Sequence, residues 1–178
     1  MTERAPAPAR WRPMDPDVPL HPAVDLTDIG LRLLAALAVG MIIGLDREWR
    51  GKPVGIRTLA LVSLGAALVC VTTVHLRAIS GEPEAIARVV SGVIEGVMTG
   101  IGFLGAGAVL QRRGGDIEGL TTAATVWVTA ALGIACGLAS WTIVAIGVGL
   151  TIVVLVLMNP VDRWVEKRRL AHERAKQD

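Results

Sequence analysis

The sequence is poor in charged and aromatic residues. Only 19% of its 178 residues are Asp, Glu, Lys or Arg, and it has one Phe and no Tyr, whereas ordinary soluble domains carry roughly 25% charge. The hydrophobic residues make up 52% of the chain and come in long blocks, with a mean hydropathy of +0.55. Blocks of this length argue against a soluble enzyme and indicate an integral membrane protein.

Cysteine is also scarce, and the basic residues form no aromatic-rich stripe. The two thiols, Cys70 and Cys136, lie in apolar stretches without a CxxC or Cys/His cluster, so no zinc site is expected. We predict two small buried side chains, with a disulfide between them as the alternative. The formal net charge of +2 and the absent stripe give no basis for a nucleic-acid partner.

The N-terminal residues lack an apolar run. Residues 1–28 contain six prolines, and this composition predicts a disordered Pro-rich tail because it buries too little apolar surface to offset the entropy of ordering. At its end, Asp25 or Thr27 is expected to cap the first helix.

Five apolar segments approach the roughly 20 residues that a membrane-spanning helix needs. They are Ile29–Leu45, Thr58–Leu76, Ile86–Leu110, Leu120–Ala139 and Thr142–Met158. The last two come from one uncharged block of 43 residues, which we divide near Gly137–Trp141. The sequence therefore predicts an all-α integral membrane protein, with five transmembrane helices in a domain over residues 29–160. A short charged cytoplasmic helix is expected over residues 161–178.

The distribution of basic residues predicts the orientation. One side of a five-span chain would hold 12 Lys and Arg residues and the other side 6. Cytoplasmic loops carry the excess of such residues. We therefore predict a multi-pass protein of the bacterial inner membrane, with the N-terminus outside and the C-terminus in the cytoplasm.

The first predicted cytoplasmic loop, residues 44–58, is crowded with charge. Its candidate functional residues are Asp46, Arg47, Glu48 and Arg57. A charged turn that only sets the topology is one interpretation. The alternative is an ordered network in which Asp46 or Glu48 pairs with Arg57, whose guanidinium offers a rigid fork of donors.

The third predicted span combines charge with glycine. Arg88 lies at its start and Glu95 inside it, and an intramembrane carboxylate is by default a functional candidate, although a structural role is weighed equally. The predicted helix-packing glycines are Gly92, Gly96, Gly100, Gly102, Gly105 and Gly107. Gly92, Gly96 and Gly100 recur every four residues and predict close helix packing. The denser stretch GIGFLGAG predicts an irregular backbone or a very tight crossing.

The fourth predicted span opens with hydroxyl side chains. Thr121 and Thr122 are candidate functional residues, and Thr121, Thr125 and Thr129 share one helix face. Hydroxyls in such positions bond back to helix carbonyls or across to a neighbouring helix.

Three stretches together resemble the MgtC/SapB family of bacterial inner-membrane proteins. They are IIGLDREWRGKPVGIRTLALVSLGAAL, RVVSGVIEGVMTGIGFLGAGAVL and GLTTAATVWVTAALGIACG. The resemblance covers about residues 30–160 and implies a five-span helical domain linked to growth at low magnesium and to stress adaptation. Many members of the family carry a folded cytoplasmic domain after the fifth span, and the resemblance here is expected to cover the membrane domain only.

Two functions follow from the resemblance. The first is a non-enzymatic protein of magnesium homeostasis and stress adaptation that modulates another membrane complex. The lipid bilayer and a membrane protein, or a second copy of the chain, would be its partners. The alternative is a transporter or channel for Mg²⁺ or another ion, with Glu95 in its pathway. No cofactor is predicted, and a Mg²⁺ site is left open.

An intramembrane hydrolase is disfavoured, and no catalytic residue is predicted. The three histidines, His21, His75 and His172, lie in the tail, at a span end and in the C-terminal segment, where they form no Ser/His pair.

Overall fold

The computed structural model describes residues 25–80, 83–111 and 117–156. Its four longest helices are α1 (Leu26–Trp49), α2 (Ile56–Ser80), α3 (Pro83–Ala108) and α4 (Leu120–Gly137). A fifth helix is described over Trp141–Val156. A two-stranded antiparallel ladder, β1 (Leu110–Gln111) and β2 (Ile117–Glu118), joins α3 to α4. The described chain is thus a helical bundle with one very short ladder.

The predicted spans match the helices, with shifts at their ends. The structure extends α1 and α2 beyond the predicted limits at both ends and places Leu110 in β1 instead of α3. The predicted break after α4 is confirmed, because the chain turns over residues 138–140, where Ala139 has a φ of 55°. The predicted tail up to residue 24, the end of the fifth span and the predicted helix over 161–178 lie outside the described residues.

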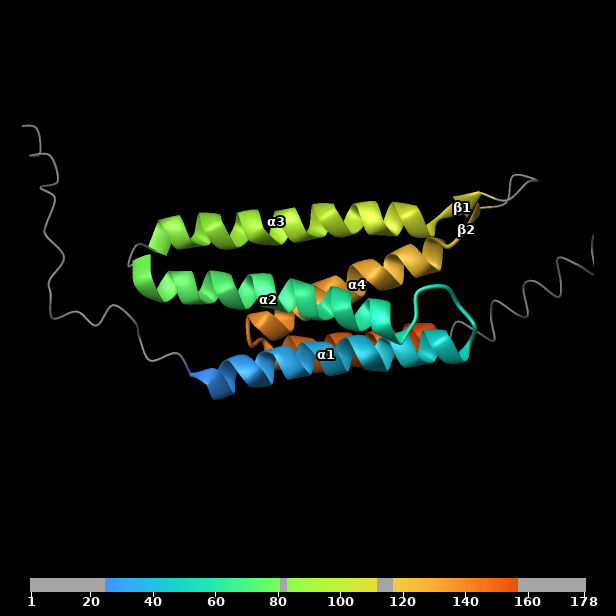
Figure 1. Cartoon of the computed structure of the whole chain (residues 1–178), viewed down its shortest axis with the longest axis horizontal. Helices are drawn as coiled ribbons and strands as arrows, with labels where there is room; N and C mark the ends of the chain where they lie inside the picture. The colour runs from blue at the N-terminus through green and yellow to red at the C-terminus, as the bar shows by residue number, and fades with distance from the viewer. Residues whose placement is uncertain (1–24, 81–82, 112–116, 157–178) are drawn as a thin grey trace, which may run out of the picture.

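Successive helices run back and forth along one bundle axis (Figure 1). The α1–α2 loop and the β1–β2 ladder lie at one end of the bundle, and the end of α2 and the beginning of α3 lie at the other. The fifth helix begins at the turn after α4 and runs back toward the end with the α1–α2 loop. The first and last described residues therefore lie at opposite ends of the bundle.

Asp25 caps α1, and it is one of the two residues predicted for this role. Its Oδ1 accepts hydrogen bonds from the backbone N–H groups of Thr27 at 3.0 Å and Asp28 at 3.3 Å. Asp28 forms an ion pair of 2.7 Å with Arg32, and Arg32 Nη1 donates to the carbonyl of Gly137 at 2.9 Å. This chain of contacts joins the beginning of α1 to the end of α4.

The centre of the bundle is formed by close backbone contacts of α1 with α2 and of α2 with α4. A Cβ added at Gly40 would lie 2.5 Å from the carbonyl oxygen of Leu59, and one at Gly133 would lie 2.3 Å from that of Ser63. The same holds one turn further along each helix, where Gly44 approaches α2 backbone and Gly137 approaches both α2 backbone and a side chain. Glycine is required at these crossings because any side chain would force the helices apart.

Both thiols are buried and free, as predicted. Cys136 lies in a cluster with Ile43 and Leu59, and Cys70 lies in a second cluster with Ala130 and Ile134. In these positions they act as small apolar side chains that fill space between closely packed helices.

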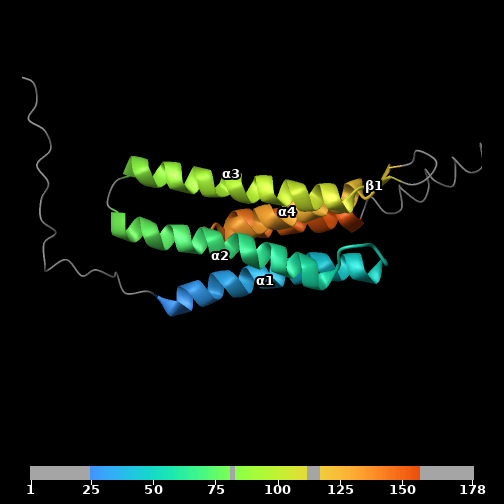
Figure 2. The same cartoon turned by 45° about the horizontal axis from the view of Figure 1, so that its top comes forward.

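Helix α3 lies at the edge of the bundle, where it contacts α4 and α2 (Figure 2). Within the segments apolar enough to span a membrane, 6% of the residues of α3 are buried, compared with 56% of those of α4. Its inward face packs on the cluster around Cys70 through Val93, Ile94, Val97, Met98 and Ile101. The helix continues without interruption to Ala108, so the predicted irregular backbone within GIGFLGAG is wrong.

Candidate functional site

The structure brings two of the sequence motifs together at Arg47. This residue lies in the last turn of α1 and is 3% exposed. Its Nη2 donates to the carbonyl of Pro53 at 3.3 Å and to the hydroxyl Oγ1 of Thr122 in the first turn of α4. One guanidinium therefore connects α1, the loop that follows it and the beginning of α4.

The α1–α2 loop that contains the Pro53 carbonyl has an unusual backbone. Gly51 has a φ of 60°, and Val54 has a φ of 64°. A β-branched residue in the left-handed region is a genuine outlier and costs roughly 1–3 kcal/mol. Two hydrogen bonds join this strained loop to Arg47, one from Arg47 Nη2 to the Pro53 carbonyl and one from the backbone N–H of Lys52 to the Arg47 carbonyl at 3.1 Å.

The loop carboxylates each have a defined partner, and neither is Arg57. Asp46 Oδ1 accepts from Nε and Nη2 of Arg50, both at 2.8 Å. Glu48 Oε2 accepts from the backbone N–H of Ile56 at 3.1 Å and so caps the beginning of α2. Arg57 is exposed and forms no ion pair with any described residue. The predicted pairing with Arg57 is wrong because partners nearer in the chain satisfy both acids.

The contacts of Arg47 with Pro53 and Thr122 form a junction of α1, the α1–α2 loop and α4. The candidate residues of α3 lie apart from this junction, on the side of α3 that faces away from the bundle. Exposed residues one turn apart form a surface that we call the outer face of α3: Ser91, Gly92, Glu95, Gly96, Thr99, Gly100 and Phe103. Glu95 makes no hydrogen bond or ion pair with any described residue, and Arg88 is exposed on the same helix. Neither residue enters the interior of the bundle.

The α3 glycines leave open space where a side chain would be. A Cβ added at Gly92, Gly96, Gly100, Gly102 or Gly107 would meet no described atom within 4 Å. Gly105 alone of the six predicted packing glycines approaches a neighbour, with Ala123 of α4 at 3.6 Å. Close packing at the other five stays a prediction, because no described helix approaches them.

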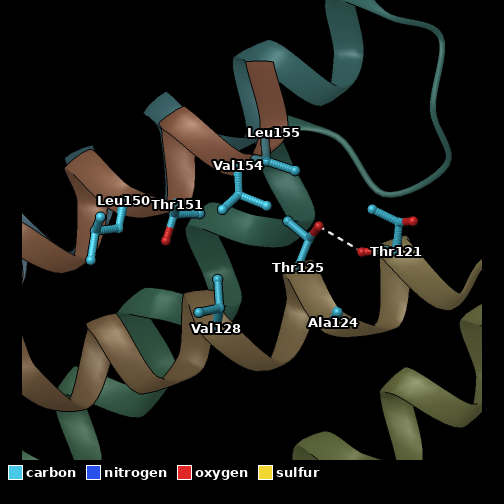
Figure 3. A pocket seen from close by; sticks show the side chains of 8 residues that line it. All are labelled: Thr121, Ala124, Thr125, Val128, Leu150, Thr151, Val154 and Leu155. Atoms are coloured by element: carbon cyan, nitrogen blue, oxygen red, sulfur yellow. Dashed lines mark hydrogen bonds between the residues drawn. The ribbon is translucent and has the colours of Figure 1, made fainter. Parts of the chain in front are cut away.

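Two hydroxyls of α4 bond back to its own carbonyls, which is one of the two predicted alternatives, whereas the Thr122 hydroxyl accepts from Arg47 of α1. Thr125 Oγ1 donates to the carbonyl of Thr121 at 2.7 Å, and Thr129 Oγ1 donates to that of Thr125 at 2.8 Å. Thr121 itself lines a pocket of about 330 Å³ between α4 and the fifth helix (Figure 3). Its lining also includes Ala124, Thr125, Val128, Leu150, Thr151, Val154 and Leu155. No pattern in the sequence indicated this mostly apolar pocket.

Comparison with known proteins identifies the family. A model of the MgtC family matches residues 33–164. The chain belongs to the MgtC family. The matched region includes Arg47, Glu95 and Thr122, so both the junction and the outer face of α3 lie in the part of the chain that defines the membership.

Two named relatives show how far the similarity extends. Protein SrpB of Synechococcus elongatus is 42% identical over 141 residues, which are 75% of this chain and 76% of SrpB. Protein MgtC of Salmonella typhimurium is 43% identical over 108 residues, which are 61% of this chain but 42% of that protein. The chain thus matches most of SrpB and less than half of MgtC. No solved structure matches it.

This member of the MgtC family is a multi-pass membrane protein. Four of its described helices are long and apolar enough to cross a membrane. Among the described residues, no three His, Cys, Asp or Glu side chains come close enough to hold a metal ion together. What the described geometry offers chemically is a buried guanidinium at one end of the bundle and a lone carboxylate on an outward helix face.

Proposed function

We propose that the chain is a non-enzymatic protein of the bacterial inner membrane that serves magnesium homeostasis and stress adaptation by modulating another membrane complex. The observation that carries the proposal is the position of Glu95, which lies on the outer face of α3 between glycines that no described atom approaches.

The chemistry of that face favours a protein partner over lipid. A carboxylate in the middle of a spanning helix costs a few kcal/mol or more, and such residues normally face protein or water. Small residues let another helix approach closely, and hydroxyls donate hydrogen bonds across the contact. Thr99 and Ser91 lie one turn from Glu95 on either side and suit this role. A partner helix would therefore cover the carboxylate and fill the space above the glycines.

We further propose five crossings, with the N-terminus outside and the C-terminus in the cytoplasm. The antiparallel order of the helices supports this arrangement, since the described chain begins and ends at opposite ends of the bundle (Figure 1). The basic α1–α2 loop would lie in the cytoplasm. Reporter fusions to the two termini test the topology, and two fusions active in the same compartment would contradict it.

Affinity capture from native membranes tests the partner. The wild-type chain should retain a specific membrane protein, and Gly96→Leu should lose it because the new side chain blocks close approach at the outer face. Gly149→Leu is the matched control, since Gly149 is also exposed and open but lies on the fifth helix. Equal capture by wild type and Gly96→Leu would refute the role of the outer face.

An ion transporter is the second candidate, and the intramembrane carboxylate of Glu95 is the feature that favours it. The outward position of Glu95 means that a route past it would run between copies of the chain and not through one bundle. Reconstitution in liposomes separates the two functions. Flux of Mg²⁺ that depends on the wild-type chain and disappears in Glu95→Gln would favour transport, and background flux in both would favour modulation.

A further inference from the structure

The pocket between α4 and the fifth helix makes almost no polar demand on what fills it. Its volume is about 330 Å³, and apolar atoms form most of its lining (Figure 3). The hydroxyl of Thr125 donates to the carbonyl of Thr121 at 2.7 Å. The hydroxyl of Thr151 donates to the carbonyl of Gly147, also at 2.7 Å. Because these hydroxyls already have partners within their own helices, an apolar group suits the pocket best.

The pocket lies near one end of both helices that form it. On α4 its lining extends from Thr121 to Val128, which is within about 12 Å of the beginning of the helix at 1.5 Å per residue. On the fifth helix the lining extends to Leu155, the residue before the last described one. An amphipathic helix in a membrane interface buries its apolar face by about 5–10 Å. A side chain from such a helix would therefore reach the pocket.

The sequence that follows the fifth helix contains apolar side chains with this pattern. Asn159–Pro160 is a turn signal, and residues 161–178 after it are rich in charge. Val161, Trp164 and Val165 have the i, i+3 and i+4 spacing of one helix face. A chain that reverses at Asn159–Pro160 brings residues at equal distances from the turn side by side, so Trp164 would lie level with Leu155 of the pocket.

We propose that residues 161–178 fold back onto the bundle and that Trp164 fills the pocket between α4 and the fifth helix. Its indole ring supplies a large apolar surface, and the N–H at its edge suits a pocket near the polar boundary of the membrane. A lipid acyl chain is the competing occupant. Trp164 has the advantage of being linked to the pocket by the eight residues that follow Val156, which gives it a high effective concentration there. The docking does not depend on the proposed function, because the contact lies within one chain.

Disulfide formation between engineered cysteines in native membranes tests the docking. Val154 lines the pocket, whereas its exposed neighbour Val153 does not. In the proposed reversal, Val165 lies level with Val154. After oxidation, Val154→Cys with Val165→Cys should form a disulfide in at least five times the yield of Val153→Cys with Val165→Cys. Mass spectrometry of the linked peptides measures both yields and distinguishes them from the buried native thiols. Equal yields, or no disulfide in either pair, would overturn the proposal and leave the pocket to lipid or to another protein.

Two variants and a control assign the contact to the indole and to the pocket. In the pair of cysteines at positions 154 and 165, Trp164→Gln should lower the yield to that of the control pair. Ala124→Phe, which fills the pocket from α4, should do the same. Gly149→Phe should leave the yield unchanged, because Gly149 is exposed and open but does not line the pocket. If Ala124→Phe does not fold, Trp164→Gln alone decides. A full yield in a folded Trp164 or Ala124 variant, or an equal loss in Gly149→Phe, contradicts the assignment.

Discussion

Glycines spaced by four residues occur in two regions of this bundle with opposite consequences. In α1 and α4, Gly40 and Gly133 bring helix backbones so close that an added Cβ would lie 2.5 Å or less from a carbonyl oxygen of α2. In α3, Gly92 and Gly96 have the same spacing and meet no described atom within 4 Å. The spacing therefore indicates a surface that a helix can approach, but not which helix approaches it. Within the described chain, α2 is the helix that approaches both Gly40 and Gly133. No described helix approaches Gly92 and Gly96, so a helix of another protein could pack there.

The largest expected effect comes from filling a central crossing. Gly133→Leu places a branched side chain against the backbone of Ser63, which has no flexible end that can move aside. We expect a loss of more than about 3 kcal/mol in the free energy of unfolding, at or beyond the upper end for overpacked cores. The measurement is the yield of monodisperse protein in detergent and its unfolding midpoint. Gly65→Leu on α2 is the control, because Gly65 is exposed and open. A Gly133→Leu chain with the yield and unfolding midpoint of the wild type would show that α2 and α4 do not need a glycine where they cross.

A smaller change at the same crossing should have an intermediate effect. In Gly137→Ala the new methyl group would lie 2.7 Å from the Cβ of Cys70 and 2.8 Å from the carbonyl oxygen of Ala67. The helices must separate by several tenths of an ångström, and we expect a loss of roughly 1–3 kcal/mol. Chemical or thermal unfolding in detergent measures it. An unchanged midpoint would mean that α2 and α4 adapt more easily than their backbone contact implies.

The same substitution on α3 should have the opposite sign. Gly92→Ala meets no described atom, and alanine is favoured over glycine inside a helix by roughly 0.5–1 kcal/mol. We therefore expect the isolated chain to be slightly more stable in detergent. Capture of the membrane partner should become weaker because the close approach is lost. A destabilised Gly92→Ala chain would show instead that α3 packs within the single bundle.

The sequence predicted the helices well but not their neighbours. Long uncharged blocks are enough to locate spanning helices, and the turn at residues 138–140 followed from a Gly, a Ser and a Trp in one block. The crossings at Gly40 and Gly133 were missed, although the pairs 40/44 and 133/137 have the same spacing as the α3 glycines. Spacing is a local property, whereas the choice of partner depends on the antiparallel order of all five helices.

The residues of the candidate site could be predicted from local motifs, but the contact between them could not, because it depends on the packing of the helices. Arg47 and Thr122 were both candidates from their own motifs, but they are 75 residues apart in the chain, so only the fold shows that they meet. Pairing of Arg57 with an acid was one of the two interpretations of the loop, based on the chemistry of its guanidinium. The structure instead pairs Asp46 with Arg50, one turn away on the same helix, because an i,i+4 pair needs little additional ordering of the chain.

The smallest effect on stability is expected at Glu95. In detergent its side chain is exposed and makes no contact that the described chain would lose, so Glu95→Gln should change the free energy of unfolding by less than about 0.5 kcal/mol. In a bilayer the same change removes the cost of a charge facing lipid while keeping a polar group of nearly the same shape. We therefore expect Glu95→Gln to be neutral in detergent unfolding but to reduce capture of the partner, which would lose its contact with the carboxyl group of Glu95. Glu48→Gln is an informative contrast, because Glu48 accepts from the backbone N–H of Ile56 and the neutral amide oxygen of Gln would accept this hydrogen bond more weakly, which should destabilise α2 in detergent. A Glu95→Gln chain that unfolds as readily as Glu48→Gln would mean that the outer face contributes to folding of the single chain.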